Sequence, residues 1–481
     1  MSARTALSSS DYLAGLVDEG SFDSWDTAPK QPKDASADYL SELAAAALHS
    51  GTDESVVTGA ARIGGRPVVV LVSEFGFLGG SIGVAAAERI VSAITRATAL
   101  GRPIIAAPAS GGTRMQEGTP AFVRMAAIAA AIRAHKDAGL LYVVHLRHPT
   151  TGGTMASWGG LGQVTWAEPG ALTGFLGPKV YRGLRGSDFP REVQRAENLH
   201  RVGLVDRVAA VGEARWEVAM LLDLVASSVR HSAVGLSPVS AGEDSVGGVD
   251  HVADVWASVL ATRAAERPAL TEFLAVAASE FLPLCGTGAG EQESSVVVAM
   301  ARVAGAACVL IGQDRAAQLA GVPLGPAGLR QARRGLRLAR ELRLPVVTVV
   351  DTPGADLSRE AEEGGLAFEI ARCLEELSTH PHPTVCVLLG EGTGGAALAL
   401  FPARHVIATG SAWLSPLPPE GASLIRYGVG DHAAELARAQ RIGANDLAAT
   451  GDVHVVSPVA GPDVSSAFPA VVEEIGRHLA R

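Results

Sequence analysis

Residues 109–118 read Ala-Ser-Gly-Gly-Thr-Arg-Met-Gln-Glu-Gly and lie between an apolar segment at 103–107 and a helical pattern that begins near Thr119. Two adjacent glycines, Gly111 and Gly112, let backbone N–H groups approach a ligand that a Cβ atom would keep away. Such donors, beside the start of a helix, favour negative charge. The sequence therefore predicts that this turn helps to build an oxyanion hole.

Strands and helices alternate around this turn. Apolar segments at 68–72, 103–107 and 141–146 have the composition of strands, and helical patterns at about 84–100 and 120–137 separate them. A succession of strand, turn and helix is typical of an α/β fold.

The second half of the chain repeats these landmarks. Ala61-Arg62-Ile63 recurs as Ala301-Arg302-Val303, an offset of 240 residues. Ser110-Gly111-Gly112 falls on Thr352-Pro353-Gly354, and Thr151-Gly152-Gly153 falls on Thr393-Gly394-Gly395, both at an offset of 242. A register that holds over so many elements indicates two copies of one α/β unit.

The repeat sets the expected domain boundaries. We expect the first copy at 37–225 and the second at 263–481. The polar segment 1–36 predicts an irregular arm. Residues 226–262, rich in Ser, Gly and Val, predict either a linker or an ordered excursion that packs on one of the units.

Composition excludes several classes of protein. The 481 residues carry a net charge of −10, which argues against a nucleic-acid binder. The four cysteines contain no C-x-x-C pair, so we expect neither a disulfide framework nor a metal, and His145 and His148 are expected to be structural. The polar start and the absence of a long apolar run predict a cytoplasmic protein without membrane contact.

Several motifs in order resemble the carboxyltransferase component of biotin-dependent acyl-CoA carboxylases. The first half resembles the bacterial β subunit in Phe75-Gly76-Phe77-Leu78-Gly79-Gly80-Ser81 and in the turn at 109–117. The second half resembles the α subunit in Val349-Val350-Asp351-Thr352-Pro353-Gly354-Ala355, in the Gly-rich stretch 390–399 and in Pro419-Glu420-Gly421-Ala422. The resemblance implies two tandem crotonase-like (ClpP/crotonase) β-β-α spiral domains, the first on the acyl-CoA side and the second on the biotin side.

This chain departs from the family pattern in places. The four-cysteine zinc ribbon of the β subunit is missing, as it is in fused acyl-CoA forms. After Ala355, Asp356-Leu357-Ser358 replaces the usual aromatic residue and Pro-Gly.

The resemblance also implies a mechanism. Carboxylation of the α-carbon of an acyl thioester places negative charge on the thioester oxygen, and a preorganised N–H donor contributes roughly 3 kcal/mol to its stabilisation. Biotin that has lost its carboxyl group carries a second oxyanion and can take the α-proton. Carried over residue by residue, Gly111, Gly112 and Gly153 serve the acyl-CoA enolate, and Gly395 and Ala396 serve biotin.

Four further residues are candidates for substrate binding. Arg114, Lys179 and Arg182 follow the first site in sequence and are expected to contact the phosphates of coenzyme A. Leu398, two positions after Ala396, is expected to line the acyl pocket, with an ordinary core position as the alternative.

The implied partners follow from what the chain lacks. No lysine follows Lys179 and no Ala-Met-Lys-Met stretch occurs, so biotin is expected on a separate carrier protein, with its ATP-dependent carboxylase also separate. The resemblance implies a homodimer as the minimum unit, with a larger ring of dimers as the alternative. The predicted substrate is a short acyl-CoA such as acetyl- or propionyl-CoA. The alternatives are a biotin-dependent decarboxylase and a non-catalytic scaffold subunit.

Overall fold

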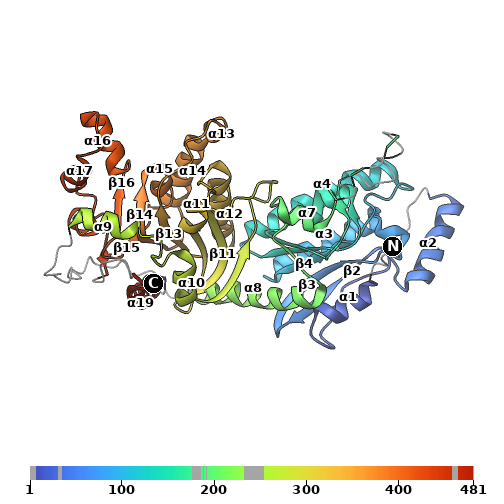
Figure 1. Cartoon of the computed structure of the whole chain (residues 1–481). Helices are drawn as coiled ribbons and strands as arrows, with labels where there is room; N and C mark the ends of the chain where they lie inside the picture. Colours follow the sequence, from blue (N-terminus) through green and yellow to red (C-terminus); the bar gives the residue numbers. More distant parts are fainter. Residues whose placement is uncertain are drawn as a thin grey trace. The chain divides into compact units, whose positions relative to one another are not determined.

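The computed structural model describes residues 7–30, 35–175, 182, 186–187, 189–190, 192–231, 254–457 and 464–479. The chain divides into two compact units, Met1–Asp223 and Leu224–Arg481 (Figure 1). Each unit holds one large β-sheet with helices packed on it, which confirms the predicted α/β class. Among the described residues, no helix is long and apolar enough to cross a membrane.

Unit 1 is built on a seven-stranded sheet. Its strands are β1 (Asp23–Ser24), β2 (Val56–Ile63), β3 (Arg66–Ser73), β4 (Ile104–Ala107), β5 (Tyr142–Leu146), β7 (Val164–Ala167) and β9 (Arg207–Val208), with β6 (Thr150–Thr151) and β8 (Thr173–Gly174) forming a separate pair. Its helices are α1 (Ser9–Leu16), α2 (Ala37–Ser50), α3 (Val84–Ala99), α4 (Gly118–Asp137), α5 (Gly152–Thr154) and α7 (Ala196–Arg201), and the unit boundary falls within α8 (Val211–His231).

The sheet of unit 1 has an antiparallel part and a parallel part. Strands β1, β2 and β3 pair antiparallel, and β3, β4, β5, β7 and β9 pair parallel. Apolar residues of α3 and α4, among them Ile90, Ile94 and Ile128, are fully buried in one core with residues of β3, β4 and β5. The parallel strands therefore direct the turns that follow β4 and β5 to the same edge of the sheet.

The segment expected as an irregular arm contains a helix. Helix α1 starts after Ser8, whose side chain accepts a hydrogen bond from the N–H of Asp11. Its apolar side buries Tyr12 and Leu16 completely. The polar residues of the segment obscured this short amphipathic pattern.

Unit 2 repeats the design of unit 1. Its strands are β10 (Ala278–Leu284), β11 (Val296–Val303), β12 (Ala306–Gln313), β13 (Val346–Thr352), β14 (Thr384–Thr393), β15 (His405–Ala408), β16 (Trp413–Ser415) and β17 (Val455–Val456). Its main helices are α9 (Val255–Thr262), α10 (Leu270–Ala277), α11 (Arg315–Leu319), α12 (Pro326–Leu342), α13 (Arg359–Glu363), α14 (Leu366–Ser378), α15 (Gly394–Leu398), α16 (Pro419–Tyr427), α17 (Ala433–Ala439), α18 (Ala444–Thr450) and α19 (Phe468–Leu479).

Strand pairing in unit 2 follows the same plan. Strands β10, β11 and β12 are antiparallel, and β12, β13, β14, β15 and β17 are parallel. Helices α10 and α19 share one buried core with these strands, through Phe273 and Phe468. A Cβ added to Gly335 of α12 would meet Val298 and Ile311 of the sheet, so α12 packs closely on the strands.

The predicted linker ends in ordered structure. Residues 232–253 lie outside the described part, but α9 follows directly, with Asp254 accepting a hydrogen bond from the N–H of Trp256. Val259 of α9 is fully buried beside Trp413. This end of the segment therefore belongs to unit 2.

Candidate functional site

The first turn of unit 1 follows β4 and has a shape that only glycine adopts easily. Gly112 has φ +112°, and its N–H donates to Ser110 Oγ at 3.0 Å. The N–H of Gly111 donates to the carbonyl of Gly79 at 2.9 Å. Both amides predicted to face the acyl oxygen therefore have hydrogen-bond partners within the chain.

The second turn of unit 1 lies directly against the first. A Cβ atom on Gly112 would lie 3.3 Å from the nitrogen of Gly153. Gly153 and Thr154 stand in the first turn of α5, where N–H groups have no partner inside the helix. The structure thus brings together Gly112 and Gly153 of the predicted set, with the Gly153 amide as an available donor.

Ser110 joins these two turns. Its hydroxyl accepts a hydrogen bond from Thr154 Oγ1 at 3.0 Å, and its carbonyl accepts the N–H of Thr151 at 2.9 Å. Ser110 and Thr154 are both fully buried. A buried, hydrogen-bonded pair of this kind fixes the position of the adjacent backbone amides.

Unit 2 contains the same arrangement of turns after β13 and β14. Gly354 has φ +135°, and its N–H donates to Thr352 Oγ1 at 3.1 Å. Gly395 and Ala396 stand in the first turn of α15, so their amides have no partner inside the helix. Ala396 is completely buried.

The carboxamide of Gln313, at the end of β12, connects the two turns of unit 2. Its Nε2 donates to the carbonyl of Ala396 at 2.7 Å, and its Oε1 accepts the N–H of Asp351 at 3.1 Å. Gln313 is fully buried. The sequence alone does not single out Gln313, because a glutamine at a strand end carries no local sign of a partner 83 residues away.

Buried ion pairs support the turns of unit 2. Arg267 Nη2 contacts both carboxylate oxygens of Asp351 at 2.7 Å, and neither side chain is exposed. Arg263 pairs with Glu391 at 3.2 Å and with Glu420 at 2.7 Å. The acidic residues of three recognised motifs are thus paired with two arginines that the sequence did not single out.

The pKa values of these carboxyl groups reflect opposing effects. Burial raises the pKa of Asp351 and of Glu391 above the ordinary range, while the neighbouring arginines oppose this rise. The two contacts from Arg267 Nη2 favour the ionised form of Asp351. Arg267 and Asp351 therefore form a buried ion pair.

Arg114 is buried and paired with acidic side chains of unit 1. It is 1% exposed, and its guanidinium donates to Glu54 Oε2 at 3.1 Å and to the Ser81 carbonyl at 2.8 Å. It also pairs with Glu117 at 3.3 Å. Arg114 is therefore a buried structural cation, contrary to the expectation of a coenzyme A contact.

The other predicted substrate-binding residues are either exposed or outside the described part of the chain. Leu398, at the end of α15, is 43% exposed, which excludes the core alternative within unit 2. Arg182 is exposed. Lys179 lies outside the described residues.

His145 and His148 are structural, as predicted. His145 Nδ1 is 2.7 Å from the hydroxyl of Tyr12, and its Nε2 is 3.0 Å from the carbonyl of Ala209. Burial lowers the pKa of His145 to about 4, so it stays neutral near pH 7. His148 Nδ1 accepts the N–H of Leu172 at 3.1 Å.

Two family models cover nearly the whole chain. Residues 6–248 match the carboxyl transferase domain. Residues 250–480 match the acetyl co-enzyme A carboxylase carboxyltransferase-like domain. The two matches divide the chain near the predicted linker.

The chain aligns with relatives of similar sequence over most of the length of each relative. The chain is 50% identical over 445 residues to the probable biotin-dependent acyl-coenzyme A carboxylase beta3 subunit of Mycobacterium tuberculosis H37Rv, covering 92% of this chain and 87% of that protein. It is 38% identical over 501 residues to the acetyl-coenzyme A carboxylase carboxyl transferase subunits beta/alpha of Salinispora arenicola, covering 99% and 87%.

Two solved structures have a similar fold. Transcarboxylase 12S, a hexamer solved with methylmalonyl-coenzyme A bound, superposes with a TM-score of 0.76 at 20% identity and covers 98% of this chain and 90% of its own. A single-chain, multi-domain long-chain acyl-CoA carboxylase gives 0.71 at 18% identity, covering 97% and 45%. These similarities confirm the predicted crotonase-like fold.

Proposed function

Because this chain belongs to the carboxyltransferase family of biotin-dependent acyl-CoA carboxylases, we propose that it transfers a carboxyl group from carboxybiotin to the α-carbon of a short acyl-CoA. Acetyl-CoA and propionyl-CoA are the proposed acceptors, and malonyl-CoA or methylmalonyl-CoA the products. The observation that carries the proposal is the pair of glycine turns found once in each unit. Two such sites suit a reaction with two developing oxyanions.

Unit 1 is proposed to bind the acyl thioester. The Gly153 amide is the proposed donor to the enolate oxygen, and Gly112 and Gly111 shape the turn against which it lies. One such donor stabilises the transition state by about 3 kcal/mol when it is fixed in advance. The bond between Thr154 and Ser110 supplies this fixation.

Unit 2 is proposed to receive biotin. The ureido oxygen of biotin is a hydrogen-bond acceptor, and the amides of Gly395 and Ala396 are two adjacent donors in the first turn of α15. Gln313 holds the Ala396 carbonyl and so orients this turn. Biotin supplies the carboxyl group and, after transfer, the base for the α-proton.

The outer parts of the substrates are assigned to three further residues. Arg182 and Lys179 remain the proposed contacts to the phosphates of coenzyme A. Leu398 is proposed to line the acyl pocket, since its exposed side chain follows the Gly395 turn by three residues.

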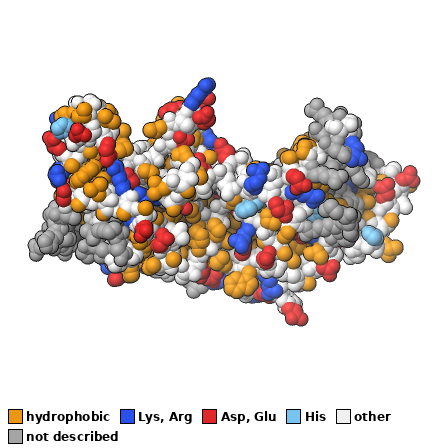
Figure 2. All heavy atoms as spheres, in the orientation of Figure 1, with side chains coloured by type: hydrophobic (Ala, Val, Ile, Leu, Met, Phe, Trp, Pro, Cys, Tyr) orange, Lys and Arg blue, Asp and Glu red, His pale blue; other side chains and the backbone are white. Residues whose placement is uncertain are grey.

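The proposed partners are a biotin carrier protein, its biotin carboxylase and a second copy of this chain. Exposed apolar side chains support association. On and around α16 they are Leu417, Leu424, Ile425, Tyr427 and Val429, with exposed fractions of 41%, 55%, 76%, 40% and 47%. Figure 2 shows orange side chains gathered over this end of unit 2. An exposed apolar area of this kind marks an interaction site.

The proposal is tested by running the transfer in reverse. Purified protein is mixed with malonyl-CoA or methylmalonyl-CoA and a free biotin derivative, and the decarboxylated acyl-CoA is measured. We expect Gly153→Ala to lower kcat by roughly 100-fold or more, because its Cβ would lie 2.8 Å from Thr113 Oγ1 and displace the turn. Gly212→Ala is the matched control, since a Cβ there has no atom within 4 Å.

Three outcomes separate the alternatives. Equal rates for Gly153→Ala and Gly212→Ala would contradict the role of the Gly153 amide. Binding of coenzyme A without any decarboxylation would favour a scaffold subunit. Reconstitution with a biotinylated carrier, its carboxylase, ATP and bicarbonate distinguishes a carboxylase, which then forms carboxylated acyl-CoA, from a dedicated decarboxylase.

A further inference from the structure

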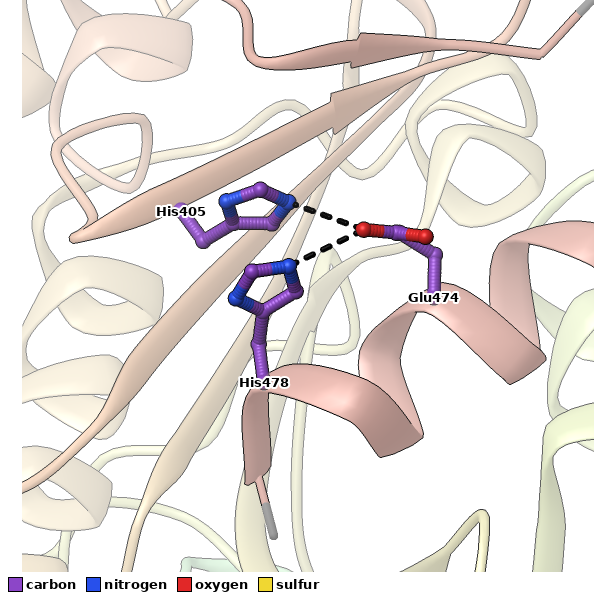
Figure 3. A group of neighbouring side chains, drawn as sticks. All are labelled: His405, Glu474 and His478. Carbon is purple, nitrogen blue, oxygen red and sulfur yellow. Dashed lines mark hydrogen bonds and ion pairs between the residues drawn. The ribbon is translucent and has the colours of Figure 1, made fainter. Parts of the chain in front are cut away.

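The last helix of unit 2 carries a cluster of metal-binding side chains that the proposed reaction does not use. His405 begins β15, and Glu474 and His478 lie one turn apart on α19 (Figure 3). Their donor atoms all lie within 4.8 Å of one another. We propose that these three residues bind a divalent transition-metal ion of the zinc class and so fasten α19 to the sheet.

The geometry of the three donors supports this proposal. His405 Nε2 is 3.4 Å and His478 Nε2 is 2.9 Å from the same oxygen, Glu474 Oε1. Donor atoms bound at about 2.0–2.1 Å around a tetrahedral zinc ion are about 3.3 Å apart. Both histidines thus direct the same ring nitrogen towards one carboxylate oxygen, as Figure 3 shows.

The chemistry of the donors indicates the kind of ion. Two imidazole nitrogens and one carboxylate oxygen suit zinc and its neighbours, whereas magnesium and calcium prefer oxygen donors alone.

Neighbouring groups hold the cluster in place. Arg477 pairs with the other carboxylate oxygen of Glu474, which leaves Oε1 directed at the histidines. His454 lies beside His405, with ring centroids 4.7 Å apart, and its Nδ1 accepts the N–H of Val406 at 3.1 Å. Such surrounding contacts orient metal ligands and limit their rearrangement.

The location of the cluster indicates a structural role. His405 pairs with Val385 near the start of β14, whereas Gly395 follows the end of that strand. The Gly395–Ala396 turn, which is proposed to receive biotin and is called the biotin turn, therefore lies at the opposite end of β14 from the cluster. Apolar residues of α19, including Phe468 and Ile475, already bury one face of the helix, and a bound ion would add a polar fastening at its flank.

The test uses the full-length chain without an affinity tag. The protein is treated with chelator, incubated with Zn²⁺, desalted and analysed for metal. We expect about one zinc ion per chain that excess Mg²⁺ or Ca²⁺ does not displace, and a higher melting temperature in zinc. His478→Gln and His405→Gln should each weaken zinc binding by more than about tenfold, without lowering the basal rate of carboxyl transfer.

The matched control is His432→Gln, which removes a histidine from an exposed His–Glu pair that has only two metal-binding side chains. This variant should retain the zinc of the parent protein. His478 lies near the end of α19, so its variant decides the question if His405→Gln does not fold. Zinc bound equally by His478→Gln and the parent, or no zinc bound by either, would overturn the proposal and leave a hydrogen-bonded cluster only.

Discussion

The paired turns of the two units have nearly the same backbone. The first glycine has φ +112° at Gly112 and +135° at Gly354, and the second has +61° at Gly152 and +69° at Gly394. In both units a hydroxyl group two residues earlier accepts the N–H of the first glycine, at 3.0 and 3.1 Å. The repeat therefore preserves backbone shape down to single hydrogen bonds.

The side chains that hold these turns together differ between the units. In unit 1, Thr154 reaches Ser110 directly. In unit 2 the position of Thr154 is taken by Ala396, and Gln313 joins the turns from a neighbouring strand. The backbone shape of the turns is therefore common to both units, and different side chains maintain it.

The largest predicted effect comes from breaking the buried Arg267–Asp351 ion pair, which has no counterpart at the matching position of unit 1. Asp351 matches Ala109 at the offset of 242 residues, so unit 1 has no acidic group at this position. Arg267→Met should lower the free energy of unfolding by about 3–5 kcal/mol, because it leaves a buried carboxylate unpaired. Urea unfolding measures the loss, and hydrogen exchange should locate it in peptides of unit 2.

An exposed pair provides the control for this variant. Arg359 and Glu363 lie 2.7 Å apart with side chains 80% and 63% exposed, and Arg359→Met should change stability by less than about 0.5 kcal/mol. The double variant Arg267→Met/Asp351→Leu should lose less than the sum of the single changes. A strictly additive loss would show that the two side chains do not act as a pair.

The second prediction concerns His145, a buried histidine of unit 1. The matching residue in unit 2, at the offset of 242, is Val387. Burial lowers the pKa of His145 to about 4, against about 6.5 in the unfolded chain. As the pH falls from 6.5 to 4 the unfolded state takes up the proton first, so unit 1 should lose about 3 kcal/mol of stability over this range.

Urea unfolding between pH 7 and pH 4.5 checks this effect. His145→Gln should be less stable at pH 7, because the variant loses the imidazole ring that joins Tyr12 to Ala209. Its stability should nevertheless fall less steeply as the pH is lowered. An unchanged slope would show that His145 does not carry the acid sensitivity of unit 1.

The fold and the positions of both turns could be predicted from the sequence, because the repeat of glycines at 242 residues reflects backbone geometry. The hydrogen-bond partners could not. The amide of Gly111 donates a hydrogen bond to the carbonyl of Gly79. The sequence around Gly111 and Gly153 does not show this difference between the two glycines. Arg267 meets Asp351 across 84 residues, and such pairings depend on the folded sheet. The sequence predicts that Arg114 contacts coenzyme A, whereas the structure buries it, because a charge in the sequence does not show whether the side chain is exposed.

The third prediction separates the two adjacent glycines of the first turn. Gly112→Ala places a Cβ 3.3 Å from Gly152 Cα at φ +112°, a conformation that costs a residue with a side chain about 1–3 kcal/mol. Gly111→Ala meets only the Gly79 carbonyl, at 3.7 Å. We expect Gly112→Ala to lose both stability and carboxyl transfer, and Gly111→Ala to retain both. Loss of transfer in folded Gly111→Ala would restore this amide as a substrate donor.

The smallest predicted effect tests whether the side chains that join the turns are specific to their unit. Thr154→Val keeps the shape of the side chain but removes its bond to Ser110, at a cost of about 1 kcal/mol in stability. Thr154 adjoins Gly153, whose amide is the proposed donor to the acyl-CoA enolate. The variant should therefore lower the rate of carboxyl transfer at the step that involves acyl-CoA. Binding of carboxylated carrier should not change, since Gln313 holds the biotin turn independently. Single-turnover measurements with acyl-CoA varied at fixed carrier check this separation, and an equal loss when the carrier is varied would show that the two turns depend on each other.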